Sequence, residues 1–254
     1  MFDVAADAYD RYMGRYAIPL APRFAEFAGV RPGQRVLDVG AGPGALTGVL
    51  AGIVGAASVT AVDPSQPFVV ANRERHPGIE ALEARAEQLP FGDDSFGAAL
   101  AQLVVQFMSD PVGGIAEMAR VTRPGGVVAA CVWDFGTGRA PLSAFWTAAA
   151  GVDPTLDGER DRAGVRPGQL TTIFEQAGLI EVEETDISAT VELDDFDAWW
   201  QPITLGVGPA GSWLVEQPSQ VQAGVRERCR QLYPDAPGIG TAFVWAARGR
   251  PTIR

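Results

Sequence analysis

VLDVGAGPGALT, residues 36–47, joins a short apolar run to a glycine-rich turn and then to a stretch with helical spacing. Apolar runs of this kind are typical of strands buried inside a parallel sheet, which predicts a strand at 35–39. Gly40, Gly42 and Gly44 let the backbone adopt positive φ and approach a ligand closely, and the following helix offers free N–H groups at its N-terminus. The stretch therefore predicts a strand, a ligand-binding turn and a helix.

The alternation of strand and helix continues along the chain. ALTGVLAGIV predicts a helix and SVTAVD at 58–63 a second strand, which together with the first strand make a βαβ unit. The elements that follow are a helix near 67–75, a strand near 79–83, a strand at 96–101, a helix at 111–121 and a strand at 126–132. Such alternation predicts a parallel sheet.

The segments around this core have a different pattern. Residues 1–30 carry aromatic and apolar residues at helical spacing, interrupted by Pro19 and Pro22, which predicts two short helices. Residues 135–166 are rich in Gly, Pro and Asp around PLSAFWTAAA, which predicts an insertion with one helix.

The sheet pattern returns later. A helix near 168–177 leads to LIEVEETDIS, and GIGTAFVWAARG follows a mostly helical segment. We therefore expect one domain over 1–254, which consists of an N-terminal cover (1–30), a cofactor-binding core (31–134) and two substrate-lid insertions (135–166 and 194–235).

Composition excludes several functions. The chain of 254 residues is 47% hydrophobic and 20% charged, which is a globular composition. A net charge of −11 repels nucleic acid and anionic membranes, so neither is an expected partner. All 20 basic residues are Arg, which excludes chemistry through a lysine Schiff base.

The two cysteines, Cys131 and Cys229, have no metal-like or disulfide-framework spacing, so we expect no metal site and a reducing compartment. The stretch MFDVAADAYDRYMGRY lacks a secretory apolar run, and no segment approaches the roughly 20 apolar residues of a membrane span. These features predict a cytoplasmic protein.

Asp63 ends the second predicted strand, 23 positions after Gly40. An acidic residue there can accept hydrogen bonds from both hydroxyls of an adenosine ribose. The alternative is that Asp63, followed by Pro64 and Ser65, caps the next helix. The glycine pattern also satisfies the relaxed dinucleotide fingerprint, so a nicotinamide cofactor remains open at this point.

Four blocks together resemble the class I S-adenosylmethionine-dependent methyltransferases, particularly the ubiquinone and menaquinone biosynthesis subgroup. These blocks are VLDVGAGPG, VTAVDPS, ARAEQLPFGDDSFGAALAQLVVQFM and RVTRPGGVVAACVW. The resemblance covers roughly residues 5–135. It implies a Rossmann-like α/β fold, with a mostly parallel seven-stranded sheet, an antiparallel last strand and helical insertions. It also implies S-adenosylmethionine as cofactor and methyl transfer as the reaction.

The resemblance assigns cofactor-binding roles to motif residues. It places the turn of Gly40, Ala41, Gly42 and Gly44 beneath the methionine moiety and Asp38 near its amino group. Asp63 would hold the ribose, with Pro64 and Ser65 bordering the adenine. Gln102 and Leu103 would line the junction of cofactor and acceptor. Tyr12 and Arg15 either close over the methionine end or serve ordinary helix packing.

One position departs from the family pattern. Arg85 stands in ARAEQLPF where the family usually has an Asp that meets the adenine amino group. A guanidinium cannot accept that hydrogen bond, so backbone groups around Ala86 and Glu87, or Glu87 itself, would have to supply the contact.

Methyl transfer from a sulfonium gains rate mainly from alignment, so a dedicated base is optional. Tyr9, Tyr12, Asp134 and Glu87 are candidate bases among which the sequence does not choose, and the catalytic residue stays unknown. His76, the only histidine, is expected at a helix end.

The expected acceptor is a small apolar or aromatic molecule under the lid, because four tryptophans, Trp146, Trp199, Trp200 and Trp213, fall in the insertions. Packing of these rings onto the sheet is the alternative. The rival functions are an NAD(P)-dependent oxidoreductase and a catalytically silent cofactor-binding module.

Overall fold

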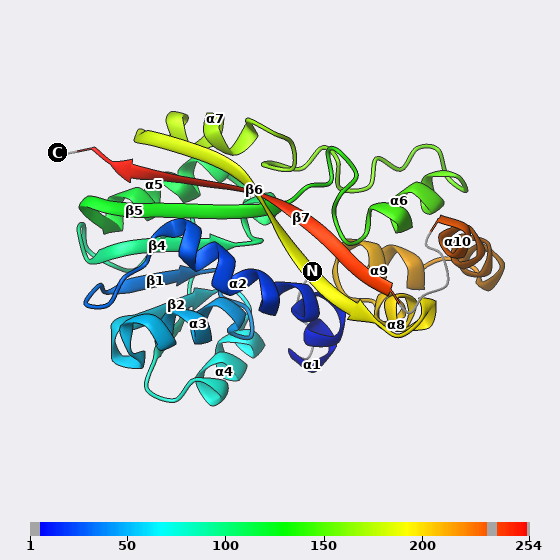
Figure 1. Cartoon of the computed structure of the whole chain (residues 1–254), viewed down its shortest axis with the longest axis horizontal. Coiled ribbons are helices and arrows are strands. Elements are labelled where there is room, and N and C mark those ends of the chain that lie inside the picture. Colours follow the sequence, from blue (N-terminus) through cyan, green and yellow to red (C-terminus); the bar gives the residue numbers. More distant parts are fainter. Residues whose placement is uncertain (1–5, 233–237, 253–254) are drawn as a thin grey trace.

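The computed structural model describes residues 6–232 and 238–252. Seven strands form one sheet in the order β3-β2-β1-β4-β5-β7-β6 (Figure 1). The strands are β1 (Val36–Val39), β2 (Val59–Asp63), β3 (Glu80–Glu83), β4 (Phe96–Gln102), β5 (Thr122–Trp133), β6 (Leu179–Leu193) and β7 (Gly238–Pro251). Pairing is parallel from β3 to β5, and β7 runs antiparallel to both β5 and β6. The predicted fold class is confirmed.

Helices cover both faces of the sheet (Figure 1). The main helices are α1 (Ala6–Tyr9), α2 (Arg15–Ala28), α3 (Ala45–Val54), α4 (Gln66–Arg75), α5 (Pro111–Val121), α6 (Ser143–Ala150), α7 (Gln169–Gln176), α8 (Phe196–Trp200), α9 (Gly208–Val215) and α10 (Ser219–Leu232). Shorter turns are the π-turn η1 (Asp10–Gly14) and the 3₁₀ turns η2 (Ala56–Ser58), η3 (Val105–Phe107) and η4 (Gln201–Leu205). Within the described residues, no helix has the length and apolar character of a membrane span.

The N-terminal cover differs from the expected pair of helices broken at its prolines. Pro19 and Pro22 both lie inside α2, which runs without interruption. A proline costs a helix interior about 3 kcal/mol or more. Leu20, Phe24 and Ala25 on the same helix are fully buried in the main core, and their burial offsets that cost. Tertiary packing therefore overrides the local proline signal.

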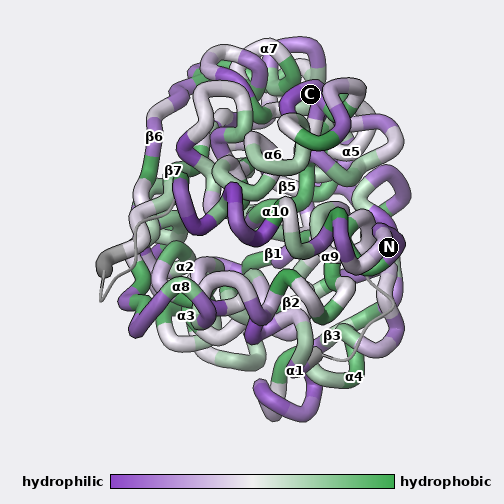
Figure 2. Tube along the Cα trace, turned by 90° about the vertical axis from the view of Figure 1, so that its right-hand side faces the viewer, coloured by the Kyte–Doolittle hydropathy of each residue, from purple (hydrophilic) through white to green (hydrophobic). Residues whose placement is uncertain are grey.

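The two insertions lie together beyond the carboxyl ends of the parallel strands (Figure 1). Helix α6 of the first insertion packs against α10 of the second. Figure 2, which views the molecule from this end, shows α6, α9 and α10 on the side toward which β5 points. The fold thus places both insertions, together with α1 and η1 of the N-terminal cover, at the carboxyl ends of the strands, where open α/β sheets bind ligands (Figure 1).

Candidate functional site

The glycine-rich turn after β1 has a left-handed backbone. The φ angle is +67° at Gly40, +54° at Gly42 and +104° at Gly44, a region that residues with a Cβ rarely adopt. A Cβ on Gly40 would lie 2.5 Å from Val104 Cγ2, and one on Gly44 would lie 2.5 Å from His76 Nε2. A Cβ on Gly42 would meet no described atom within 4 Å. Packing therefore requires glycine at the first and third positions, whereas open space faces the second.

The carboxylate of Asp63 joins this turn to the loop before α4. The Gly42 N–H donates to one carboxylate oxygen and the Ser65 N–H to the other, both at 2.8 Å. Burial raises the pKa of Asp63, and these two hydrogen bonds oppose the rise. The N-cap of α4 is Ser65, so Asp63 orders the loop ahead of the helix instead of capping it.

Asp38 lies beneath the turn, away from the cavity wall. Its carboxylate accepts a hydrogen bond from Thr47 Oγ1 at 2.7 Å, and burial raises its pKa to about 7. The side-chain amide of Asn72 donates to Thr47 Oγ1 at 3.0 Å and to the Gly42 carbonyl at 3.3 Å. This buried network fixes the turn against α3 and α4.

A cavity of about 540 Å³ opens above the turn, within the size range of small-molecule sites. We call it the large cavity. Gly40, Gly42, Asp63, Pro64 and Ser65 line it, as do Gln102 and Leu103 at the end of β4. The cavity lies beside the junction of β1 and β4, where the strand order reverses and ligands bind in such sheets. Seven of the residues predicted from the sequence therefore meet at one cavity.

Leu103 and Gln102 have unusual local structure. Leu103 has a φ of +64°, a strained value for a residue with a branched side chain that is common at binding sites. Its N–H donates to the Cys131 carbonyl at 2.8 Å, which holds the strained residue against β5. The Gln102 amide donates to the Ala17 carbonyl at 3.1 Å and so links the cavity wall to α2.

The remaining predicted residues lie outside the wall of the large cavity. Ala41 and Gly44 belong to the turn but do not line the cavity. Ala86 is buried. The Glu87 carboxylate accepts hydrogen bonds from the N–H and the hydroxyl of Ser109, each at 2.8 Å, and so fixes the loop before α5.

Tyr12 and Arg15 of the N-terminal cover also have other contacts. The Arg15 guanidinium donates to the carbonyl oxygens of Ala198 at 2.5 Å and of Trp199 at 3.2 Å, which ties the cover to α8. Tyr12 is buried and lines a second, smaller cavity.

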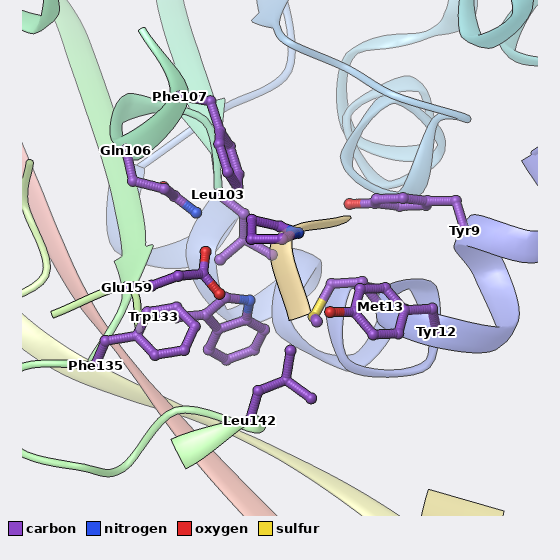
Figure 3. Close-up of a pocket in the computed structure, with 11 residues that line it drawn as sticks. Tyr9, Tyr12, Met13, Leu103, Gln106, Phe107, Trp133, Phe135, Leu142 and Glu159 are labelled. Carbon is purple, nitrogen blue, oxygen red and sulfur yellow. The ribbon is translucent and has the colours of Figure 1, made fainter. Parts of the chain in front are cut away.

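This small cavity, of about 30 Å³, adjoins the large one and shares Tyr9, Leu103 and Phe107 with it (Figure 3). Its other walls come from η1, from Trp133 at the end of β5, from the 135–166 insertion and from Pro209 of α9. Residues of the cover and of both insertions therefore meet at a chamber next to the large cavity.

The tryptophans of the insertions line neither cavity. They pack with two phenylalanines into one cluster, with ring centroids 5.2 to 6.5 Å apart. The members are Phe145, Trp146, Phe196, Trp199, Trp200 and Trp213. The prediction that these four indoles line the acceptor pocket is therefore wrong: they pack the insertions against one another, and other rings build the aromatic cavity wall.

Comparison with known proteins identifies the family. A methyltransferase domain model matches residues 37–130. An uncharacterised methyltransferase of Mycobacterium tuberculosis (strain ATCC 25618 / H37Rv) is 31% identical over 243 residues, which cover 95% of this chain and 88% of that protein. The chain belongs to the class I S-adenosylmethionine-dependent methyltransferases. Members of this class use S-adenosylmethionine as methyl donor.

Two further proteins are similar to this methyltransferase, one in sequence and one in fold. A demethylmenaquinone methyltransferase of Beutenbergia cavernae is 40% identical over 98 residues, which is 39% of this chain and 40% of that protein. The YcgJ protein of Bacillus subtilis has a similar fold, with a TM-score of 0.61 and 17% identity over 94% of this chain and 99% of that one. The first similarity spans less than half of either protein, and the second shows a similar fold over nearly the whole chain.

Sequence reasoning missed several residues that line the large cavity of this methyltransferase. Glu83 ends β3 directly opposite Asp63 of β2, and Phe68, Val104 and Phe107 add apolar surface. Glu83 could have been predicted as a neighbour of Asp63, because it ends the next strand and the carboxyl ends of neighbouring parallel strands meet at the same edge of a sheet. The apolar residues had no comparable local signal.

Arg85 lines the large cavity with a side chain that is 61% exposed, and its Nε lies 3.8 Å from Glu87 Oε2. An exposed pair of this kind contributes little, about 0–1 kcal/mol. We expect Arg85→Asp to leave the affinity for S-adenosylhomocysteine within about fivefold of the parent or to improve it, because a carboxylate can accept a hydrogen bond from adenine. Calorimetric titration measures this affinity. A loss well beyond tenfold would show that Arg85 itself holds the cofactor.

Proposed function

We propose that this methyltransferase binds S-adenosylmethionine in the large cavity and transfers the methyl group to a small apolar or aromatic acceptor. The acceptor would reach the methyl group from the side of the small cavity. The observation that carries the proposal is the meeting of Gly42, Asp63 and Glu83 at one cavity beside a chamber closed by the lid segments.

The residues present fit the cofactor. The open space facing Gly42 leaves room for a ligand to approach the backbone. Each oxygen of the Asp63 carboxylate accepts one backbone N–H and retains further lone pairs, so both can also accept ribose hydroxyls. Phe68 and Phe107 offer apolar surface for the adenine and the methylthio group.

S-adenosylmethionine would supply an activated methyl group on a positively charged sulfur. The protein's contribution is then to hold the acceptor in line with that group and to exclude water. Tyr9, Leu103 and Phe107 border both cavities and so occupy the passage between donor and acceptor. The net charge of −11 disfavours polyanionic acceptors.

The test is incubation of purified protein with methyl-labelled S-adenosylmethionine and a panel of phenols, quinols, polyketide-like aromatics and amines. We expect label in at least one small aromatic product, together with stoichiometric S-adenosylhomocysteine. A reaction without the protein provides the background, and Asp63→Ala should reduce the transfer at low donor concentration. Transfer only to nucleic acid or protein would contradict the proposed acceptor class. Cofactor binding without any transfer would favour the silent-module alternative.

A further inference from the structure

Polar side-chain atoms without partners gather at the small cavity. Within residues 6–232 and 238–252, the Tyr12 hydroxyl, Gln106 Oε1 and Trp133 Nε1 are buried and have no hydrogen-bond partner. All three residues line this cavity. Buried polar groups are nearly always hydrogen-bonded, because an unpaired group loses its hydration without compensation. Three such atoms at one cavity therefore indicate that a ligand supplies their partners.

A buried carboxylate completes this set. Glu159 is 3% exposed, and its Oε2 accepts a hydrogen bond from Trp146 Nε1 at 3.1 Å. Its Oε1 lies 3.5 Å from Arg162 Nε, in the same insertion. Figure 3 shows the Glu159 carboxylate and the Tyr12 hydroxyl directed into the cavity, and the atom of the Gln106 amide that faces the cavity is its nitrogen. Burial raises the pKa of Glu159, while the contacts with Trp146 and Arg162 oppose the rise.

The hydrogen bonds that these atoms can donate or accept determine which chemical groups the ligand must carry. Trp133 Nε1–H can only donate, so the ligand must offer an acceptor. The ionised Glu159 carboxylate can only accept, so the ligand must also offer a donor. An ammonium group only donates and a carbonyl or ether only accepts, whereas a hydroxyl does both. The surrounding rings, including Tyr9 and Phe107, favour an aromatic carrier for that hydroxyl.

We infer that the small cavity receives the hydroxyl group of an aromatic methyl acceptor and that Glu159 takes its proton. This inference rests on the proposed function. In the transfer, the hydroxyl proton moves to a Glu159 oxygen and the acceptor oxygen forms a bond to the methyl carbon. The carbon–sulfur bond of the donor breaks, and its electron pair stays on sulfur. The products are the methyl ether, S-adenosylhomocysteine and protonated Glu159.

The size of the cavity adds a requirement. A volume of about 30 Å³ holds a hydroxyl-sized group or a water but no aromatic ring. Entry of the ring would therefore require one wall of the cavity to move, and the segment that carries Tyr9 and Tyr12 forms one of these walls. Arg15, which ties this cover to α8, limits how far the segment can open.

The inference is tested on protein saturated with S-adenosylhomocysteine, by titration with 4-methylphenol, toluene and benzylamine. We expect 4-methylphenol to bind at least about tenfold more tightly than the other two probes. This difference corresponds to the free energy that hydrogen bonds to buried, otherwise unpaired groups contribute to binding. Tyr12→Phe removes one unpartnered atom, so we expect the preference to fall below about threefold while thermal stability of the free protein stays equal or rises. Asp157→Asn, an exposed change in the same insertion, should preserve the preference.

Glu159→Gln tests the proton acceptor. With the best hydroxyaromatic acceptor from the labelled panel, we expect transfer to fall at least about 100-fold, with unchanged affinity for S-adenosylhomocysteine and partial recovery in Glu159→Asp.

Three results would overturn the inference. These are equal or absent binding of all three probes, transfer to amines alone, and full activity of Glu159→Gln. If S-adenosylhomocysteine itself fails to bind the parent protein, the proposed function fails first; if it binds and the hydroxyl preference is missing, only this inference fails.

Discussion

Asp63→Ala is expected to weaken binding of S-adenosylhomocysteine by about 1.5 to 3 kcal/mol, the range for hydrogen bonds to a charged group and equivalent to roughly 10- to 150-fold. The variant loses the acceptor for the ribose hydroxyls. It also releases the N–H groups of Gly42 and Ser65, each held at 2.8 Å in the parent. Calorimetric titration measures the loss.

Asp63→Asn serves as the matched control. Its single amide oxygen can replace only one of the two carboxylate acceptors, so an intermediate affinity is expected. Circular dichroism should show the parent fold in both variants, because the released N–H groups border an open cavity and can bind water. Parent-like affinity in Asp63→Ala, accompanied by lost stability, would mean that Asp63 only orders the loop before α4.

Gly42→Ala is expected to reduce binding of S-adenosylhomocysteine at least about 100-fold while the protein stays folded. The added Cβ meets no described protein atom within 4 Å and enters the space where the ligand must approach the turn. The free protein should lose only about 1 to 2 kcal/mol, the cost of a left-handed backbone for a residue with a Cβ. Titration and thermal unfolding separate these two effects.

Gly33→Ala is the control that measures the loss of stability caused by a left-handed backbone alone. Gly33 has a φ of +84°, and a Cβ added there would also face open space. It precedes β1, however, and so lies at the amino end of that strand, away from the large cavity. We expect a similar loss of stability with unchanged affinity. Equal affinities in both alanine variants would show that the ligand does not approach the turn at Gly42.

The parts of the fold that could be predicted from the sequence have local signals. The strand, turn and helix over residues 36–54 follow from an apolar run, glycines at fixed spacing and helical periodicity, which need no distant contact. Asp63 could be predicted because its separation from Gly40 along the sequence corresponds to the length of one βαβ unit. The uninterrupted helix through Pro19 and Pro22 was not predictable, because it depends on burial of Leu20 and Phe24 against the rest of the core.

The residues proposed to bind the acceptor could not be predicted, because they come together only through contacts between parts of the chain that are far apart in sequence. Trp133, Glu159 and Tyr12 are far apart in sequence and meet only after the first insertion and the N-terminal cover fold over the end of β5. No spacing rule connects them. The concentration of tryptophans in the insertions was a misleading signal, because rings such as Trp199 and Trp200 stabilise the packing of the insertions themselves.

Calorimetric titration of the unmodified protein with S-adenosylhomocysteine and, separately, with NAD and NADP tests the central claim most directly. The arrangement of Gly42, Asp63 and Glu83 around the large cavity predicts saturable binding of S-adenosylhomocysteine and no binding heat with either dinucleotide. Tight binding of NAD or NADP, with no response to S-adenosylhomocysteine, would contradict it.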